Sequence, residues 1–453
     1  MGKFFGTDGV RGVAGSELTA ELAYKLGKFG AYVLTKHTKS KKTKILVGKD
    51  TRISGDMLEN ALVAGILSTG ADAFIVGEIP TPAIAYLTRK YEADAGVVIS
   101  ASHNSFEYNG IKFFNSEGFK LSDEIENEIE SYLLGESVID EIPSGENLGI
   151  AIRGANNAES DYVEFAASCA LTSLEGLKVA ADCANGAAFN VAPQALRRLG
   201  AELNVISNNP DGININNGCG STHIEKLQKF VKDTGADVGV AFDGDADRLI
   251  AVDENGNIVD GDVIMGLVSI YLKEHNKLPG NRLIGTVMSN LGLIQTCEKH
   301  GIEVICTKVG DRYVLEKMLE TGAVIGGEQS GHIILFEHNT TGDGLVSAIT
   351  LLSVLKISGK KLSELAKEIT ILPQVLVNVK VKNEYKERLT DIDEISDAAN
   401  KISEKYKSTG RLLLRPSGTE PLVRIMIEGQ NMEEIEKDAK MLAEIVEQSM
   451  SRL

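Results

Sequence analysis

The stretch Gly70-Ala71-Asp72-Ala73-Phe74-Ile75-Val76 decides the fold class, because it joins the end of a helix-like segment to an apolar strand. Glycine ends helices well because it adopts the left-handed conformation easily. The same order of glycine, acidic step and strand returns at residues 200–206 and 301–306. Strands rich in Val, Ile and Leu without alternation indicate a sheet covered on both faces. The pattern predicts three related α/β domains with mixed sheets.

The last part of the chain, from residue 372, has a different pattern. Strands are expected at residues 375–381, 411–414 and 422–427, with one helix after the first strand and another after the last. In the final helix, Ile435, Ala439, Leu442 and Val446 recur at steps of three and four residues, which is the spacing of a buried helix face. This order predicts a smaller C-terminal α+β domain with an antiparallel sheet.

The length of 453 residues is enough for three or four domains. Residues 134–157 are rich in Gly, Ser, Glu and Asn, so we interpret them as a link between the first two domains. The expected boundaries are 1–155, 156–256 and 257–370 for the α/β domains, and 371–453 for the α+β domain.

Composition excludes several classes of protein. There are 47 Lys and Arg residues against 64 Asp and Glu, and the net charge of −17 disfavours binding to nucleic acid or to an anionic membrane. The five cysteines, none spaced C-x-x-C, argue against a disulfide framework and fit a reducing compartment. No apolar run reaches the roughly 18 residues that span a bilayer, and the start lacks a signal-peptide core. We expect a cytoplasmic protein.

The sequence Asp243-Gly244-Asp245-Ala246-Asp247-Arg248 directly follows an apolar strand. Three carboxylates at alternate positions can converge on one cation, and their oxygen atoms suit Mg²⁺ or Ca²⁺. An EF-hand is the rival interpretation, because Ile250 and Glu254 fall at the eighth and twelfth positions of such a loop. However, Arg248 stands where that loop needs glycine, and the flanks have strand patterns. An enzyme loop whose metal is shared with a phosphate is therefore favoured over an EF-hand or a solvated turn.

Other motifs could handle phosphate or sugar. Residues 100–104, Ser-Ala-Ser-His-Asn, follow a buried strand, where α/β proteins place reactive groups, although they form no G-x-S-x-G elbow and could be an ordinary turn. Residues 415–421, Arg-Pro-Ser-Gly-Thr-Glu-Pro, with Arg424, combine groups that suit phosphate, against an ordinary Pro-Gly turn. Residues 326–332, Gly-Gly-Glu-Gln-Ser-Gly-His, suit sugar hydroxyls or a polar turn. Residues 5–12 and 109–112 each place a cation beside glycines.

Together these motifs resemble those of the α-D-phosphohexomutase superfamily. The resemblance covers the whole chain, and S-A-S-H-N, D-G-D-A-D-R, G-E-Q-S-G-H and R-P-S-G-T-E-P are specific as an ordered set. The opening F-G-T-D-G-V-R-G and the glutamine in G-E-Q-S-G-H point to the branch that acts on glucosamine phosphates. Ser105 stands where many relatives have proline, and this change removes no chemical group from the site.

The resemblance implies four domains around a central cleft that binds one Mg²⁺ per chain. Ser102 would be the phosphoserine, and Mg²⁺ would be held by Asp243, Asp245, Asp247 and a phosphate oxygen on Ser102. The expected catalytic residues are Ser102, Arg11, His103, Lys112, Arg248 and His332. The expected substrate contacts are Glu328 and Ser330 for sugar hydroxyls, and Arg415, Ser417, Gly418, Thr419 and Arg424 for the phosphate that is not transferred.

The resemblance also implies an isomerase that interconverts glucosamine 6-phosphate and glucosamine 1-phosphate and supplies UDP-GlcNAc synthesis. Ser102 would donate its phosphate to form glucosamine 1,6-bisphosphate, which would turn over and return its other phosphate. Either His332 or Lys112 could be the general base. A phosphomannomutase or phosphoglucomutase is an alternative within the enzyme class. A Ca²⁺-binding or phosphosugar-binding protein without activity is the alternative outside it. Relatives suggest a homodimer.

Overall fold

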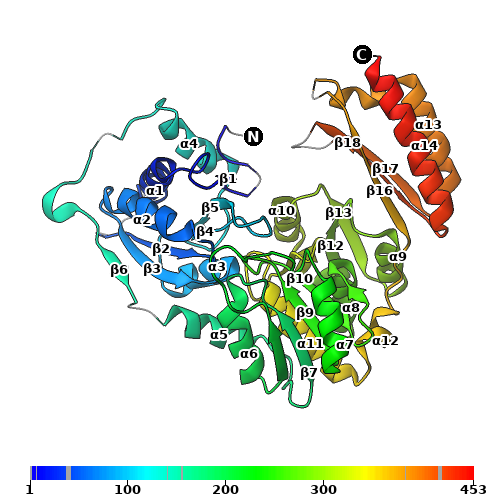
Figure 1. Cartoon of the computed structure of the whole chain (residues 1–453), viewed down its shortest axis with the longest axis horizontal. Helices are drawn as coiled ribbons and strands as arrows, with labels where there is room; N and C mark the ends of the chain where they lie inside the picture. Colours follow the sequence, from blue (N-terminus) through cyan, green and yellow to red (C-terminus); the bar gives the residue numbers. More distant parts are fainter. Residues whose placement is uncertain are drawn as a thin grey trace. The chain divides into compact units, whose positions relative to one another are not determined.

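The computed structural model describes residues 3–6, 8–36, 42–139, 141–154, 157–382, 384–416 and 421–452 (Figure 1). The chain divides into two compact units. The first comprises Met1–Met288 with His300–Glu368, and the second comprises Ser289–Lys299 with Ile369–Leu453. Among the described residues, no helix combines the length and the apolar composition that crossing a membrane requires.

The N-terminal sheet of the first unit has six strands in the order β1-β5-β4-β2-β3-β6. These strands are β1 (Val10–Val13), β2 (Lys44–Lys49), β3 (Asp72–Glu78), β4 (Ala95–Ile99), β5 (Tyr108–Asn115) and β6 (Ala151–Arg153). The helices beside them are α1 (Ala20–Thr35), α2 (Gly55–Leu67), α3 (Thr81–Lys90) and α4 (Asp123–Leu133), followed by a 3-10 turn at Gly145–Asn147. The sheet is mixed, because β5 is antiparallel to β1 and β4 while β2, β3, β4 and β6 are parallel.

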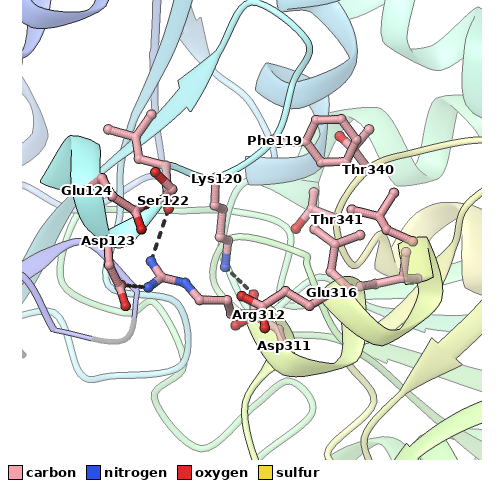
Figure 2. Close-up of a pocket in the computed structure, with 14 residues that line it drawn as sticks. Phe119, Lys120, Ser122, Asp123, Glu124, Asp311, Arg312, Glu316, Thr340 and Thr341 are labelled. Atoms are coloured by element: carbon pink, nitrogen blue, oxygen red, sulfur yellow. Dashed lines mark hydrogen bonds and ion pairs between the residues drawn. The ribbon is translucent and has the colours of Figure 1, made fainter.

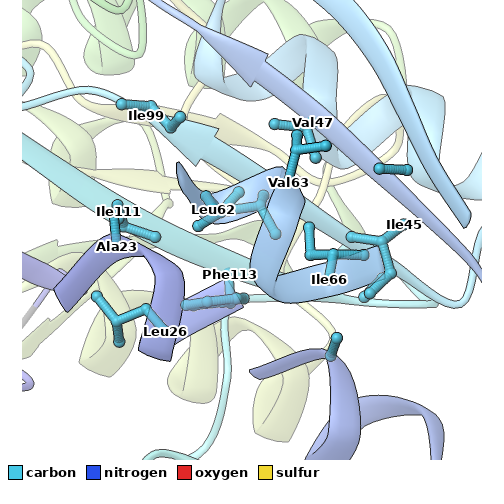
Figure 3. Close-up of a cluster of buried hydrophobic side chains, with 14 of the residues drawn as sticks. Ala23, Leu26, Ile45, Val47, Leu62, Val63, Ile66, Ile99, Ile111 and Phe113 are labelled. Atoms are coloured by element: carbon cyan, nitrogen blue, oxygen red, sulfur yellow. The ribbon is translucent and has the colours of Figure 1, made fainter. Parts of the chain in front are cut away.

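One face of this sheet is sealed by an apolar cluster. Leu26 of α1 and Leu62 of α2 are fully buried with Ile45, Ile99 and Phe113 of the sheet (Figure 3). On the opposite face, Ile84 of α3 approaches the sheet glycines Gly48 and Gly96. Because β4 is covered on both faces, its carboxyl end is rigidly placed.

The second sheet of the first unit has the order β11-β10-β9-β7-β8. Its strands are β7 (Lys178–Asp182), β8 (Glu202–Ile206), β9 (Val238–Phe242), β10 (Leu249–Asp253) and β11 (Ile258–Val259), and its helices are α5 (Ala158–Ser168), α6 (Ala188–Arg198) and α7 (Glu225–Thr234). Strand β9 is parallel to β7 and antiparallel to β10. The antiparallel pair β9–β10 carries the predicted metal loop at its turn.

The third sheet has the order β13-β12-β14-β15. Its strands are β12 (Arg282–Thr286), β13 (Glu303–Thr307), β14 (Ile325–Gly327) and β15 (Ile333–Leu335). The neighbouring helices of the first unit are α8 (Gly261–Glu274), α10 (Asp311–Thr321), α11 (Gly344–Ser358) and α12 (Leu362–Ala366), with a 3-10 turn at Pro279–Asn281. The turn between β14 and β15 carries the predicted sugar-binding motif.

The second unit contains an antiparallel sheet in the order β16-β18-β17. Its elements are α9 (Leu291–Lys299), β16 (Gln374–Lys380), a 3-10 turn (Lys386–Asp391), α13 (Asp393–Tyr406), β17 (Arg411–Pro416), β18 (Leu422–Glu428) and α14 (Met432–Ser451). Ile435, Ala439, Leu442 and Val446 of α14 are fully buried, which confirms the face expected from their spacing. Asn431 caps α14 by accepting hydrogen bonds from the N–H groups of residues 433 and 434.

The fold class is as predicted, but two expectations about individual strands were wrong. Residues 134–157 are not only a link, because β6 lies within them and extends the first sheet beside β3. Strands β8 and β13 are edge strands with partly exposed side chains, so they are not covered as completely as their apolar composition suggested. Composition reports how apolar a strand is, but its position in the sheet decides how much of it is buried.

Candidate active site

Ser102 lies just beyond β4, at the carboxyl end of that buried strand. Its backbone φ is +52°, a left-handed conformation that costs a non-glycine residue roughly 1–2 kcal/mol. The side chain is buried, and its Oγ donates a hydrogen bond to Asp243 Oδ2 at 2.6 Å. The hydroxyl that the sequence singled out therefore touches the predicted metal loop, although 141 residues separate the two positions.

The metal loop is the turn between β9 and β10, in which Phe242 pairs with Leu249. Gly244 allows the turn to approach the Ser102 loop, because a Cβ atom there would lie 2.5 Å from the Ser102 carbonyl oxygen. Strands on both sides of the turn contradict the EF-hand interpretation, which requires helices. Glu254, the residue that would complete an EF-hand, instead accepts a hydrogen bond from Ser363 Oγ at 2.5 Å.

Asp243, Asp245 and Asp247 form a compact buried group of carboxylates. One oxygen from each lies within 4.8 Å of the others, and all three residues are at most 4% exposed. Burial raises the pKa of Asp243 well above its usual range, and the charges of Asp247 and Asp245 raise it further. Burial and then Asp245 likewise raise the pKa of Asp247. The three negative charges therefore need a cation to be stable together.

The donor set fits a divalent metal ion. Asp245 Oδ1 and Asp247 Oδ1 are buried and receive no hydrogen bond from any described residue. Buried carboxylate oxygens without a partner are strongly disfavoured unless a ligand satisfies them. Oxygen-only ligands at this spacing suit Mg²⁺ or Ca²⁺ rather than zinc.

Lys112 of β5 and Arg11 of β1 come from paired antiparallel strands and supply positive charge beside the carboxylates. Lys112 Nζ lies 2.8 Å from Asp245 Oδ2 and 2.9 Å from Asp8 Oδ2, and Arg11 is paired with Asp8. Burial acts to lower the pKa of Lys112, but Asp245 and Asp8 outweigh it and raise the pKa. Lys112 is therefore a fixed cation at neutral pH.

Asp245 has the opposite electrostatic environment to Asp243. Burial acts to raise its pKa, but the charge of Lys112 and hydrogen bonds from Lys112 and Thr81 hold it below the usual value. Thr81, the first residue of α3, donates from Oγ1 to Asp245 Oδ2 at 2.6 Å. Asp245 therefore remains ionised, with one oxygen bound to protein and the other available.

Arg248 and His332 lie beside Asp247, and His103 lies beside Ser102. Arg248 and His332 form an isolated antiparallel bridge, and His332 Nε2 lies 3.9 Å from Asp247 Oδ2. Both ring nitrogens of His332 are buried without a hydrogen-bond partner among the described residues. His103 Nδ1 lies 3.5 Å from Ser102 Oγ, and burial followed by Arg248 and Arg11 lowers the pKa of His103 to about 4. His103 is therefore neutral at pH 7.

The turn that carries Glu328 and Ser330 is anchored to neighbouring loops. Glu328 Oε1 accepts from the N–H of Gly310 at 3.1 Å, and Gln329 Nε2 donates to Asp260 Oδ2 at 3.0 Å. Gly331 has φ of +90° and a Cβ there would lie 2.1 Å from the carbonyl oxygen of Leu249, so glycine is required. Ser330 is exposed at the tip of the turn, where a ligand hydroxyl could reach it.

A network beside the carboxylates was missed by the sequence analysis. Lys120 bridges Asp8 at 2.6 Å and Asp311, and Asp311 Oδ2 also lies 3.8 Å from His332 Nε2. Lys120 and Asp311 also line a cavity of about 250 Å³ (Figure 2). Asp8 belongs to the quoted F-G-T-D-G-V-R-G motif and could have been singled out there. Lys120 and Asp311 have no local signal, because their pairing depends on tertiary structure.

The predicted phosphate-binding residues belong to the second unit. Arg415 of β17 is the direct cross-strand partner of Arg424 in β18. Burial and the neighbouring Arg424 lower the pKa of Arg415, as expected when two cations share a small space. Ser417, Gly418 and Thr419 lie outside the described residues.

Comparison with known proteins assigns the chain to a family. Four domain models of phosphoglucomutase/phosphomannomutase match in order: α/β/α domain I over residues 2–138, domain II over 160–256, domain III over 260–371 and the C-terminal domain over 376–445. A phosphoglucosamine mutase of Acetivibrio thermocellus is 58% identical over 450 residues, which cover 99% of this chain and 100% of that protein.

Two solved structures have the same fold. A phosphoglucomutase/phosphomannomutase family protein of Burkholderia thailandensis has a TM-score of 0.81 at 25% identity, covering 98% of this chain and 97% of its own. An N-acetylphosphoglucosamine mutase of Aspergillus fumigatus, solved with GlcNAc-6P and magnesium, has a TM-score of 0.72 at 17% identity, covering 99% and 96%.

The chain therefore belongs to the phosphoglucomutase/phosphomannomutase family and is a mutase, an isomerase with four family domains. Within that family, a full-length relative at 58% identity is a phosphoglucosamine mutase.

Proposed function

We propose that the chain interconverts glucosamine 6-phosphate and glucosamine 1-phosphate, through a phosphoserine at Ser102 and a glucosamine 1,6-bisphosphate intermediate. The observation that carries this proposal is the 2.6 Å hydrogen bond from Ser102 Oγ to a member of the buried aspartate group. The 58% identity to a phosphoglucosamine mutase over nearly the whole chain supports the amino sugar rather than a neutral hexose. Such a product would feed UDP-GlcNAc synthesis.

The transfer step can be described with groups of this chain and of the sugar phosphate alone. The bond between phosphorus and Ser102 Oγ breaks while a bond forms to the free hydroxyl of the sugar phosphate, and the hydroxyl proton passes through a base to Ser102 Oγ. Lys112 is ion-paired and cationic, which disfavours it as that base. Neither ring nitrogen of His332 makes a hydrogen bond to a described residue, which leaves them available and favours His332 as the base. Lys112, Arg11 and Arg248 then stabilise negative charge on the phosphoryl group.

The family is magnesium-dependent, and we propose Asp243, Asp245 and Asp247 as protein ligands for one Mg²⁺ per chain. When bound there, Mg²⁺ would neutralise charge on the transferring phosphoryl group. The carboxylates themselves hold Lys112 and the N–H of Arg248 in place, the latter through Asp243 Oδ1 at 3.2 Å. The loop of residues 243–248 thus organises cationic groups around Ser102.

The remaining residues of the site have separate proposed roles. Glu328 and Ser330 bind sugar hydroxyls, while Arg415, Ser417, Gly418, Thr419 and Arg424 bind the phosphate that is not transferred. We propose that each of the domains 1–155, 156–256, 257–370 and 371–453 contributes one loop. In that order, the loops carry the phosphoserine, the metal ligands, the sugar contacts and the phosphate contacts. The five free cysteines support a reducing, cytoplasmic setting.

Intact-mass measurement tests the nucleophile directly. We expect a fraction of the wild-type protein to be heavier by one phosphate group, and this fraction should be absent from Ser102→Ala. Ser105→Ala is the matched control, because Ser105 is an exposed hydroxyl in the same loop and should leave the phosphate in place. An unchanged phosphorylated fraction in Ser102→Ala would show that the nucleophile is another residue.

Coupled assays test the substrate. We expect turnover of glucosamine 6-phosphate to exceed that of mannose 6-phosphate and glucose 6-phosphate. A preference for either neutral sugar would replace the proposed activity with a phosphomannomutase or phosphoglucomutase activity.

A further inference from the structure

One buried side chain, Arg52, binds the backbone that carries Ser102. Arg52 lies three residues beyond the end of β2. Because β2 and β4 are parallel neighbours, the loops that follow them lie at the same edge of the sheet. The residue is 3% exposed. A guanidinium group has five N–H donors in a fixed plane, and Arg52 has an acceptor for each of them.

The four terminal donors of Arg52 bind backbone carbonyl groups. Nη2 donates to the carbonyl oxygens of Ser102 at 2.9 Å and Asn104 at 2.8 Å. Nη1 donates to the carbonyl oxygens of Tyr108, at 3.0 Å, and Ser105. The loop between β4 and β5, together with the first residue of β5, is therefore attached at four points to one rigid plane.

Asp50 fixes the guanidinium group from the other side. Its Oδ2 accepts from Arg52 Nε at 2.8 Å and from Ser100 Oγ at 2.6 Å. Ser100 Oγ in turn accepts from the backbone N–H of Ser102 at 3.0 Å. Asp50 and Ser100 are both at most 1% exposed, so the connection is buried. Ser102 is therefore held through its N–H as well as its carbonyl oxygen.

Asn216, in the segment between β8 and α7, binds the same two carbonyl oxygens a second time. Its Nδ2 donates to the carbonyl oxygens of Ser102 at 2.9 Å and Asn104 at 3.0 Å. Asn216 lies between β8 and β9, two strands of the second sheet, so its bonds tie the Ser102 loop to the part of the chain that carries the metal loop.

We propose that Arg52 is a positioning residue for phosphoryl transfer, which holds Ser102 in its left-handed conformation with Oγ directed at Asp243. A serine keeps a positive φ only where its surroundings over-determine it, and these hydrogen bonds supply that constraint. Without them Ser102 can relax to an ordinary conformation and turn Oγ away. This inference rests on the proposed function, because it requires Ser102 to exchange phosphate.

The consequence is a specific kinetic defect. Phosphoryl transfer needs the attacking and leaving oxygens in line, and a displacement of about 1 Å can lower the rate about 100-fold. Arg52 is assigned no contact with the sugar or with the phosphate that is not transferred. Loss of its geometry should therefore lower kcat and leave KM nearly unchanged.

Arg52→Lys tests this, because lysine keeps the charge but places its three donors on a single atom. We expect kcat to fall about 100-fold, with KM for glucosamine 6-phosphate near that of the wild type. The rate at which glucosamine 1,6-bisphosphate phosphorylates Ser102, followed by intact mass, should fall by a similar factor. Arg89→Lys is the matched control, since half-buried Arg89 binds Asn339 and is assigned no part in the site. It should keep wild-type kcat and phosphorylation rate.

Asn216→Gly provides a second test of how Ser102 is positioned, which can be used if Arg52→Lys does not fold. Asn216 has φ of +58°, and glycine accepts that conformation while removing the two donated bonds. Asn276→Gly is its control, because Asn276 has φ of +57° at an exposed position far along the chain from the site loops. We expect slower Ser102 phosphorylation in Asn216→Gly only.

The outcomes that would contradict the proposals are distinguishable. If the wild type is phosphorylated, a wild-type phosphorylation rate in folded Arg52→Lys would overturn the role of Arg52 alone. A rise in KM without a fall in kcat would also overturn it. A wild-type rate in folded Asn216→Gly would contradict the claim that hydrogen bonds to the carbonyl oxygens of Ser102 and Asn104 position Ser102. A wild-type protein that never carries phosphate on Ser102 would overturn the proposed function, and this inference with it.

Discussion

At the scale of single residues, the two carboxylate oxygens of Asp245 have different environments, and this difference predicts the effect of removing its charge. Its Oδ2 binds Lys112 and Thr81, while Oδ1 is free of partners among the described residues. Asp245→Asn preserves the shape but removes the charge that a metal needs. We expect most activity to be lost and the Mg²⁺ concentration for half-maximal activity to rise by roughly tenfold or more. The measurement is a Mg²⁺ titration of activity after removal of bound metal.

Glu254→Gln is the matched control for that titration. Glu254 is the acidic residue that an EF-hand would use, but the structure places it against Ser363. Its Mg²⁺ dependence should equal that of the wild type. Substantial activity in Asp245→Asn, or a shifted titration in Glu254→Gln, would contradict the three-aspartate site.

How far residues could be assigned from the sequence depends on whether their partners are local. The three aspartates share one short turn after a buried strand, so their convergence was predictable. Asp50, Thr81 and Lys120 were not identified, because each acts through a partner at least 50 residues away in the sequence. No local pattern distinguishes such a residue from an ordinary strand end or helix start.

At the scale of elements, apolar composition predicted the buried strands well and their sheet positions poorly. Strands β4 and β9 were expected and are fully buried on both faces. Strand β6 was missed because it has three residues, with Gly and Asn on either side, and gains its partner only through β3. Sheet order depends on long-range pairing, which a single sequence does not specify.

Helices α1 and α2 of the first domain approach each other closely at a glycine, and this close approach predicts the effect of adding a side chain there. A Cβ atom at Gly27 of α1 would lie 2.1 Å from the carbonyl oxygen of Leu62 in α2. Alanine favours a helix by about 1 kcal/mol over glycine, but overpacking costs about 1–3 kcal/mol. The clash involves backbone on both helices, so we expect Gly27→Ala to lower the free energy of unfolding. Urea unfolding measures the change.

Ala64→Leu is the control for the helix pair, because it adds volume on the exposed side of α2. Its unfolding midpoint should stay close to that of the wild type. If Gly27→Ala were instead more stable than the wild type, helix propensity would outweigh packing, and the close approach of α1 and α2 would be contradicted.

At the scale of the whole molecule, an acidic protein must bind an anionic substrate. The net charge is −17, so phosphate binding depends on local groups of cations rather than on overall attraction. In the first unit Arg11, Lys112 and Arg248 stand beside carboxylates. In the second unit Arg415 and Arg424 are cross-strand partners. Two adjacent guanidinium groups repel each other, and a bound anion would relieve that repulsion.

This pair of arginines is expected to set the affinity for the sugar phosphates. Arg415→Ala removes a charged hydrogen-bond donor, worth about 1.5–3 kcal/mol, so KM should rise about 10- to 100-fold for both sugar phosphates. The kcat should change little, because Arg415 is proposed to bind the phosphate that stays in place during transfer. Steady-state kinetics in both directions measure this, with the exposed Arg452→Ala as the control of equal charge change. A fall in kcat at unchanged KM would instead assign Arg415 to the transition state.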